Sequence, residues 1–201
     1  ETFYLDKHSL IPRQDTELII DLVIEQFDKE SKHNILDLGT GSGVIGITLS
    51  KLYPNSIITI SDISSKALNV ANKNIKKHNV TNIRSLESDW FDNFKEKELF
   101  DLILTNPPYI SKNDVHLNNL ELGYEPSNAL VAANDGFADI FKIIDTSPKF
   151  LNSEGLLMIE HGHTQGHKVK NYFQQKSFDN IKQQRDINQK IRVTTASKIK
   201  V

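Results

Sequence analysis

Asn106, Pro107, Pro108 and Tyr109 directly follow an apolar run and form the segment of the chain best suited to chemistry. Each proline fixes its own φ and biases the preceding residue away from helix, so we predict a stiff, extended loop. The Asn106 side-chain oxygen and the Pro107 carbonyl can each accept one N–H of a planar NH₂ group. Tyr109 offers a ring face on which that group can lie.

Two such hydrogen bonds would turn a conjugated amide or amine nitrogen into a nucleophile. Its lone pair is delocalised, and pulling the nitrogen toward tetrahedral geometry aims the pair at an electrophile held in line. Methyl transfer from a sulfonium needs this alignment and no metal ion. The alternative is a purely structural role, as a turn that begins at Asn-Pro. However, Asn-Pro-Pro-Tyr arises by chance in a chain of this length with odds of about one in a thousand.

A glycine cluster in LDLGTGSGVIG, residues 36 to 46, is the second candidate site. It ends a predicted strand and opens a helix, so the backbone can turn sharply and a ligand can approach closely. Asp62 ends the next predicted strand about 20 residues later, where an acid would bind ribose hydroxyls. The pattern indicates a nucleotide-like ligand and fits both NAD and S-adenosylmethionine. A tight turn, with Asp62 capping a helix at Ser64, is the structural alternative.

Two details favour S-adenosylmethionine over NAD. Asp37 precedes the glycines, where its carboxylate could orient the loop or meet the ammonium of an amino-acid ligand, a group that NAD lacks. Asp89 and Trp90 follow a third predicted strand, where an adenine could be stacked and its exocyclic amine bound. The alternative is a buried tryptophan beside a helix-capping aspartate.

The elements that must position these residues alternate between strand and helix, which is typical of a parallel sheet with helices on both faces. The last two strands are close in sequence and are predicted to pair antiparallel at one edge. Pro148 is expected to bend or end the helix that contains it. The predicted strands cover 34–38, 56–61, 83–88, 99–105, 156–160, 178–186 and 191–199, and the helices 11–27, 44–52, 64–78, 136–151 and a stretch after Gly166.

Composition limits the possible classes of protein. A chain of 201 residues with 38% hydrophobic and 25% charged residues predicts one domain, with residues 1–30 as a linker and a leading helix that packs on it. The absence of cysteine excludes disulfides and a cysteine nucleophile and favours the cytoplasm. No segment approaches the roughly 20 apolar residues of a membrane span. A net charge of −2 argues against nucleic acid as a direct substrate.

Other polar residues are weaker candidates for a site. Three histidines lie close together in the sequence, but glycines between them break any regular geometry, so a structural or solvated role is favoured and no metal is expected. Glu125 either positions a loop or caps a turn before Pro126. The histidines are His161, His163 and His167.

The motifs DLGTGSG, SDW and NPPY, with LIPRQDTE before them and YEPSNAL and IEHG after them, resemble the HemK/PrmC family of protein glutamine N5-methyltransferases. The resemblance runs from about Leu10 to the C-terminal strands. It implies an α/β fold of the Rossmann-like class I methyltransferase type, with a seven-stranded, mostly parallel sheet and an antiparallel edge hairpin. It further implies S-adenosylmethionine as donor and S-adenosylhomocysteine as product.

The same resemblance implies an acceptor and a set of site residues. The acceptor would be the glutamine of the Gly-Gly-Gln loop of class 1 peptide chain release factors, so that methylation modulates translation termination. Asn106, Pro107 and Tyr109 would be catalytic, and Pro108 would complete the substrate clamp. Asn106 would also face the cofactor, whose other contacts would be Gly39, Thr40, Gly41, Ser42, Gly43, Asp62 on the ribose and Trp90 near the adenine.

The chain departs from the family pattern in two places. Family members carry a small helical N-terminal domain that helps to dock the release factor, whereas this chain begins at the linker. The segment RDINQKIRVTTAS also lacks the glycine expected near its turn, which leaves the shape of the edge hairpin open.

Two other functions remain possible from the sequence. A similar tetrapeptide would orient the N6 amine of adenine in DNA or RNA, although the chain has no basic excess to hold nucleic acid. A binding module with the same fold and no chemistry is the other alternative, which the intact Asn106 and Tyr109 disfavour.

Overall fold

The computed structural model describes residues 2–6, 14–111, 131–176 and 178–200. Its main feature is a seven-stranded sheet of order β3-β2-β1-β4-β7-β9-β8, in which β9 runs antiparallel to β7 and β8 and the other pairs are parallel. The predicted sheet with its antiparallel edge hairpin is confirmed. The strands are β1 (Asn34–Leu38), β2 (Ile57–Asp62), β3 (Ile83–Glu87), β4 (Phe100–Thr105), β7 (Leu151–Glu160), β8 (Phe178–Arg185) and β9 (Ile191–Lys198).

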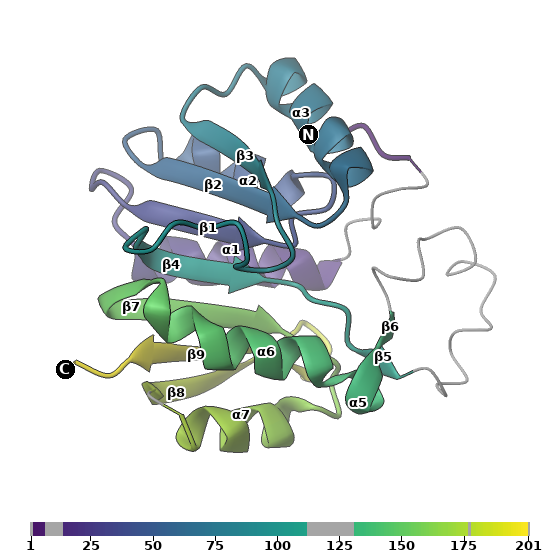
Figure 1. The fold of residues 1–201 in the computed structure, drawn as a ribbon, viewed down its shortest axis with the longest axis vertical. Helices are drawn as coiled ribbons and strands as arrows, with labels where there is room; N and C mark the ends of the chain where they lie inside the picture. The colour runs from purple at the N-terminus through teal and green to yellow at the C-terminus, as the bar shows by residue number, and fades with distance from the viewer. Residues whose placement is uncertain (1, 7–13, 112–130, 177, 201) are drawn as a thin grey trace.

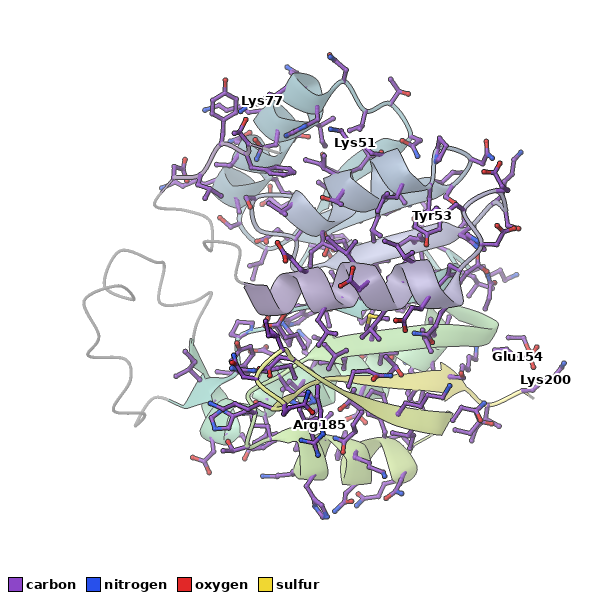
Figure 2. All side chains as sticks on the ribbon, turned by 180° about the vertical axis from the view of Figure 1, so that it is seen from behind. Lys51, Tyr53, Lys77, Glu154, Arg185 and Lys200 are labelled. Atoms are coloured by element: carbon purple, nitrogen blue, oxygen red, sulfur yellow. The ribbon has the colours of Figure 1, made fainter. Side chains whose placement is uncertain are left out.

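Helices cover both faces of this sheet. Figure 1 shows α6 and α7 in front of the sheet, and Figure 2 shows α1 and α2 across the opposite face. A helix was predicted over residues 136–151, with Pro148 expected to bend or end it. The prediction was too long, because α6 ends at Thr146, a 3₁₀ turn carries Pro148, which has no N–H to continue the helix, and β7 begins at Leu151. The helices are α1 (Gln14–Gln26), α2 (Val44–Leu52), α3 (Ser65–His78), α6 (Ala138–Thr146), η3 (Ser147–Lys149) and α7 (Gly166–Gln174).

Alternating side chains of the strands fill two cores, one on each face. On β1, Ile35 packs on the side of α1 and α2, while Leu36 packs on the side of α6 and α7. The leading helix α1 buries Ile19 and Val23 completely in the first of these cores. Each such side chain removed from water stabilises the fold by about 1.5–3 kcal/mol, so α1 is an integral part of the packed sheet.

Helix boundaries follow from local capping chemistry. The Ser64 hydroxyl accepts a hydrogen bond from the Ala67 N–H at 3.2 Å, and α3 ends at Asn79 in the left-handed conformation. Helix α1 begins at Gln14.

The edge hairpin turns without a glycine. Gln189 takes the left-handed conformation with φ 63°, and the Asp186 side chain accepts a hydrogen bond from the Lys190 N–H at 2.9 Å. Asp186 is buried and also accepts a hydrogen bond from Arg192 at 3.0 Å. These bonds around Asp186 stabilise a conformation for which the sequence pattern led us to expect glycine.

Three short elements were not predicted. The two-residue strands β5 (Ile110–Ser111) and β6 (Val131–Ala132) pair in parallel, and β6 leads into α5 (Ala133–Gly136). Asn134 and Asp135 within α5 have positive φ, a conformation that hydrophobic periodicity cannot predict. Among the described residues, no helix is both long and apolar enough to cross a membrane.

Gly46 provides a test of how closely α2 lies on the sheet. A Cβ at this position would lie 2.3 Å from the Cγ2 atom of Ile60 on β2, a distance that requires the helix to move. Alanine is intrinsically better than glycine inside a helix by about 1 kcal/mol. We nevertheless expect Gly46→Ala to lower the free energy of unfolding in urea by about 1–3 kcal/mol.

The half-buried Thr48 on the same helix supplies the control. Thr48→Ala should change the free energy of unfolding by less than about 0.5 kcal/mol. A Gly46→Ala protein that is more stable than the wild type would contradict the packing described for α2 and β2.

Candidate functional site

The predicted site residues gather at the edge of the sheet where β1, β2 and β4 end. Figure 1 shows the arrowheads of these strands pointing to the same side. The glycine cluster follows β1, Asp62 ends β2 and Asn106 follows β4. Because ligands of open α/β sheets bind outside the carboxyl ends of their strands, this edge is the candidate site.

Residues 39–43, called here the glycine loop, have a backbone conformation that residues other than glycine rarely adopt. Gly39, Gly41 and Gly43 have φ of 78°, 58° and 84°, all in the left-handed region. The N–H groups of Gly39 and Thr40 both donate to the Ser61 carbonyl, at 2.9 and 2.8 Å. The loop is therefore fastened across the sheet to the end of β2.

The buried carboxylate of Asp37 holds the same loop through hydrogen bonds. Its Oδ2 atom accepts hydrogen bonds from the Thr40 hydroxyl at 2.6 Å and from the Gly46 N–H at 3.0 Å. Burial raises the pKa of Asp37 to about 6, while the two hydrogen bonds act in the opposite direction. Of the two roles open for Asp37, these contacts support the orientation of the loop.

Asp62 links the glycine loop to α3. Its Oδ2 atom accepts from the Gly41 N–H and its Oδ1 atom from the Ser64 N–H, both at 2.9 Å. Burial raises its pKa, and bonds from the backbone oppose this. A carboxylate has about four lone-pair sites, so Asp62 keeps capacity for a ligand hydroxyl. It therefore caps the turn before α3 and can still accept a hydrogen bond from a ligand hydroxyl.

The surroundings of the loop fit a nucleoside ligand such as S-adenosylmethionine. A Cβ on Gly41 would meet nothing within 4 Å, so this residue faces open space. The Ser61 hydroxyl is buried at the same strand end and has no hydrogen-bond partner among the described residues. Backbone curvature, an acid and an open approach thus occur together at one place.

Trp90 closes one side of the glycine loop. A Cβ on Gly39 would lie 3.2 Å from a carbon of the indole ring, and the indole N–H donates to Asp139 of α6 at 3.1 Å. Trp90 is half-buried, so part of the ring remains accessible. Asp89 pairs instead with Lys142 of α6 at 3.0 Å. Asp89 and Trp90, the two residues predicted to bind adenine, thus both contact α6.

Residues 106–109, called here the Asn106 loop, start beside the glycine loop. The buried Thr105 hydroxyl donates to the Leu38 carbonyl at 2.6 Å, which ties the last residue of β4 to the last residue of β1. Asn106 is half-buried and Pro107 is buried. The Tyr109 hydroxyl donates to Oε1 of Glu160 at 3.4 Å. The segment forms no helix and leads into β5, in agreement with the prediction of an extended loop.

Two buried amides that sequence reasoning missed support these loops. Gln165 donates from Nε2 to the Tyr109 carbonyl at 2.9 Å. Asn74 of α3 donates to the Ser42 carbonyl at 2.9 Å and also bonds the N–H and carbonyl of Tyr4. The available signal for Asn74 was its position three residues after Ala71, on the apolar stripe of α3.

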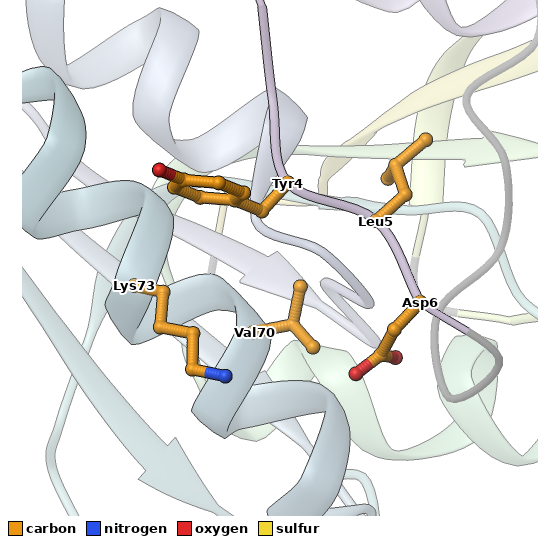
Figure 3. Close-up of a pocket in the computed structure, with 5 residues that line it drawn as sticks. All are labelled: Tyr4, Leu5, Asp6, Val70 and Lys73. Atoms are coloured by element: carbon orange, nitrogen blue, oxygen red, sulfur yellow. The ribbon is translucent and has the colours of Figure 1, made fainter.

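The segment of residues 2–6 lies along α3 near the glycine loop. Figure 3 shows a pocket between this segment and the helix, lined by Tyr4, Leu5, Asp6, Val70 and Lys73. The ammonium of Lys77 lies 4.3 Å from the centre of the Tyr4 ring. Asn74 thus connects the N-terminal segment and the glycine loop through one side chain.

Of the three histidines near the end of β7, only His161 is buried, and its contacts indicate a structural role. His161 is fully buried, with Nε2 2.7 Å from the Thr194 hydroxyl and Nδ1 3.0 Å from the Gly162 carbonyl. His163 and His167 are exposed. No group of three metal-ligating side chains occurs within the part of the chain that the structure describes. Glu125, Pro126 and the motif YEPSNAL lie outside that part.

Comparison with protein families and curated proteins identifies close relatives. The family model described as methyltransferase small domain matches residues 16–122. A release factor glutamine methyltransferase of Francisella tularensis is 39% identical over 197 residues, which cover 98% of this chain and 69% of the relative. One of Escherichia coli is 37% identical over 191 residues, covering 95% of this chain and 68% of the relative. The chain thus spans about two thirds of their length.

Solved structures share the fold at low sequence identity. A ribosomal protein L11 methylase of Lactobacillus delbrueckii superimposes with a TM-score of 0.70 at 18% identity, covering 93% of this chain and 80% of the other. A T. thermophilus 16S rRNA N2 G1207 methyltransferase in complex with AdoMet and guanosine gives 0.70 at 17% identity, over 94% and 44%. These likenesses show that the chain shares the fold of these two methyltransferases.

Acidification is expected to destabilise the protein through His161. Burial lowers the pKa of His161 from 6.5 to about 4, so between these values the unfolded chain binds a proton that the folded chain does not. The stability from this group is complete above about pH 6.5 and is lost as the pH falls toward 4, by up to about 3 kcal/mol. In urea denaturation, His161→Gln should flatten this part of the stability–pH curve.

His167→Gln, at an exposed position nearby, is the matched control and should leave the slope unchanged. Asp37, whose raised pKa acts in the opposite sense, is present in both variants and cancels from the comparison. A wild-type slope in the His161→Gln protein would show that His161 is not the titrating group.

Proposed function

The chain belongs to the family of release factor glutamine methyltransferases, and we propose that it methylates the side-chain amide of a glutamine in a peptide chain release factor, with S-adenosylmethionine as donor. The observation that carries the proposal is the adjacency of the two loops. The Thr105–Leu38 hydrogen bond sets the Asn106 loop beside the glycine loop, so an amide nitrogen held by one can face a methyl group held by the other.

The cofactor residues proposed are those of the glycine loop together with Asp62 and Trp90. S-adenosylmethionine supplies a methyl group on a sulfonium, which leaves as the neutral thioether of S-adenosylhomocysteine. Asp62 has acceptor capacity for ribose hydroxyls, and the open space at Gly41 admits close approach. Trp90 offers a half-exposed ring to the adenine. The loop residues are Gly39, Thr40, Gly41, Ser42 and Gly43, and Asn106 is placed at the boundary with the acceptor.

The acceptor residues proposed are Asn106, Pro107, Pro108 and Tyr109. The Asn106 side-chain oxygen and the Pro107 carbonyl would each accept one N–H of the glutamine amide, leaving its N5 lone pair directed at the methyl group. The Tyr109 ring would support the planar amide. The stiffness of the loop matters because a nucleophile displaced by about 1 Å loses about 10²-fold in rate.

The finer identity of the acceptor is also a proposal. We propose the glutamine of the Gly-Gly-Gln loop of class 1 release factors, since the two glycines before it leave the side-chain amide free to enter a narrow clamp. Methylation there would modulate translation termination. Because release factors act at ribosomes, we place the activity in the cytoplasm.

Residues 1–201 are proposed to act as one catalytic unit. The leading helix α1 contributes Ile19 and Val23 to the core, and residues 2–6 bind Asn74 beside the glycine loop. Residues 1–30 thus support the site rather than forming a unit of their own.

Adenine N6 methylation is the second candidate, and two observations disfavour it. The curated relatives quoted above are release factor glutamine methyltransferases. The net charge of −2 provides no basic excess for a nucleic acid. The rRNA methyltransferase among the structural neighbours is 17% identical and shares the fold alone.

Asn106→Ala tests the proposed clamp. The variant should bind S-adenosylmethionine in calorimetry within a few-fold of the wild type, because the glycine loop and Asp62 are intact. Labelled methyl transfer to a release factor should fall by about 10²-fold or more, because the amide nitrogen is no longer aligned. Asn69→Ala, at an exposed position on α3, is the control and should retain activity. Equal losses of binding and transfer in Asn106→Ala would contradict this role.

Asp62→Ala tests the proposed ribose contact. Loss of hydrogen bonds to the half-buried carboxylate, worth about 1.5–3 kcal/mol each, should weaken the affinity for S-adenosylmethionine by about 10-fold or more. Asp92→Ala removes an exposed acid and should leave the affinity unchanged. Calorimetric titration measures both, and an unchanged dissociation constant in a folded Asp62→Ala protein would move the ribose contact elsewhere.

A further inference from the structure

Gln165 occupies a buried position between β7 and α7, with only 7% of its surface exposed. It closes the turn that follows β7 in two ways. Its N–H donates to the Gly162 carbonyl at 2.9 Å, and its side-chain oxygen accepts from the Gly162 N–H at 2.8 Å. The oxygen end of the amide is thus used within the turn.

The nitrogen end of the same amide reaches the Asn106 loop. It donates to the Tyr109 carbonyl at 2.9 Å and lies 3.4 Å from the Gly136 carbonyl. A Cβ on Gly136 would lie 2.1 Å from the Tyr109 carbonyl oxygen, so the backbone of α5 presses on the same atom. The carbonyl of Tyr109 is therefore a point where three segments of the chain meet.

The turn that carries Gln165 is itself anchored to the edge hairpin. The His161 N–H donates to the Arg192 carbonyl at 2.9 Å, and the Gln183 side chain donates to the Gly166 carbonyl at 2.7 Å. His161 adds its contact with the Thr194 hydroxyl. The donor on Gln165 is thus held by β8 and β9, and it connects the edge hairpin of the sheet to the Asn106 loop.

Tyr109 is held a second time through its ring. Its hydroxyl donates to Glu160, which is completely buried at the end of β7, directly before the same turn. Restraint of the carbonyl and the hydroxyl together limits the rotation of the ring plane. That plane is the surface on which the acceptor amide would lie.

We infer that Gln165 is a positioning residue for methyl transfer, which fixes Tyr109 and through it the orientation of the Asn106 loop. The inference rests on the proposed function of that loop. Gln165 bonds the backbone of Tyr109 and is not among the residues proposed to hold either ligand. It acts by donating one hydrogen bond to the Tyr109 carbonyl from a turn anchored elsewhere.

Gln165→Glu separates the two functions of this amide. A glutamate oxygen still accepts from the Gly162 N–H, so the turn is preserved. An ionised carboxylate has no donor and repels the Tyr109 carbonyl, so the contact with the loop is lost. A protonated carboxyl regains one O–H donor, and burial raises the pKa of such a group. Lowering the pH should therefore restore the hydrogen bond to the Tyr109 carbonyl in this variant.

The experiment compares Gln165→Glu with wild type and with Gln174→Glu, which adds the same charge at an exposed position of α7. Labelled methyl transfer to a release factor is measured from about pH 5.5 to about 8.5. At the alkaline end, we expect kcat of Gln165→Glu to fall by about 10- to 100-fold, with KM for S-adenosylmethionine close to wild type. The buried carboxylate lowers the thermal midpoint at this pH, so transfer is measured at a temperature at which the variant is folded. The ratio of mutant to wild-type kcat should rise as the pH falls.

Hydrogen exchange of backbone amides provides a readout without turnover. In Gln165→Glu at alkaline pH, amides within residues 106–111 should exchange faster than in wild type, while those of β4 keep their protection. Gln174→Glu should behave as wild type in both measurements. Slower transfer with faster exchange confined to this segment is the combined result expected of a positioning residue.

Several results would overturn the inference. These are an unchanged kcat, a pH-independent loss, an equal loss in Gln174→Glu, or unchanged exchange within residues 106–111. A wild-type protein that methylates no release factor would instead refute the proposed function. In that case the exchange measurement still decides whether Gln165 holds the loop.

Discussion

The candidate site depends on β1 and β4 ending side by side. Parallel pairing sets Leu38 opposite Thr105, and a buried hydroxyl-to-carbonyl hydrogen bond of 2.6 Å joins these two residues. One strand continues into the glycine loop and the other into the Asn106 loop. A shift of one residue in this register would turn alternate side chains to the wrong face and separate the two loops. The chemistry proposed for the protein needs both loops at the same edge.

Each loop is then held by buried or half-buried polar groups of neighbouring elements. The carboxylates of Asp37 and Asp62 take up N–H groups of the glycine loop and of the helices that follow. Gln165 and Glu160 take up the carbonyl and the hydroxyl of Tyr109. Buried polar groups are costly unless paired, so these partners specify one arrangement of each loop. Such preorganisation suits a reaction in which alignment of a weak nucleophile is the main requirement.

Much of the fold could be predicted because local chemistry determines it. The alternation of strands and helices located α2 and α3, α6 ends just before Pro148, and two late strands formed the predicted hairpin. The supports of the site could not be predicted, because Gln165 bonds a residue 56 positions away and Asn74 one 32 positions away. The turn at Gln189 was missed for a different reason, because its support is local: the Asp186 side chain bonds Lys190 and Arg192, four and six positions away, where the sequence pattern led us to expect glycine.

Location of the transferred methyl group tests the central claim most directly. A purified release factor and its Gly-Gly-Gln to Gly-Gly-Ala variant would be incubated with the protein and labelled S-adenosylmethionine, beside an adenine-rich duplex. The account predicts label on the wild-type factor alone, carried by the side-chain nitrogen of that glutamine. Label on the Gly-Gly-Ala factor or on the duplex would contradict it.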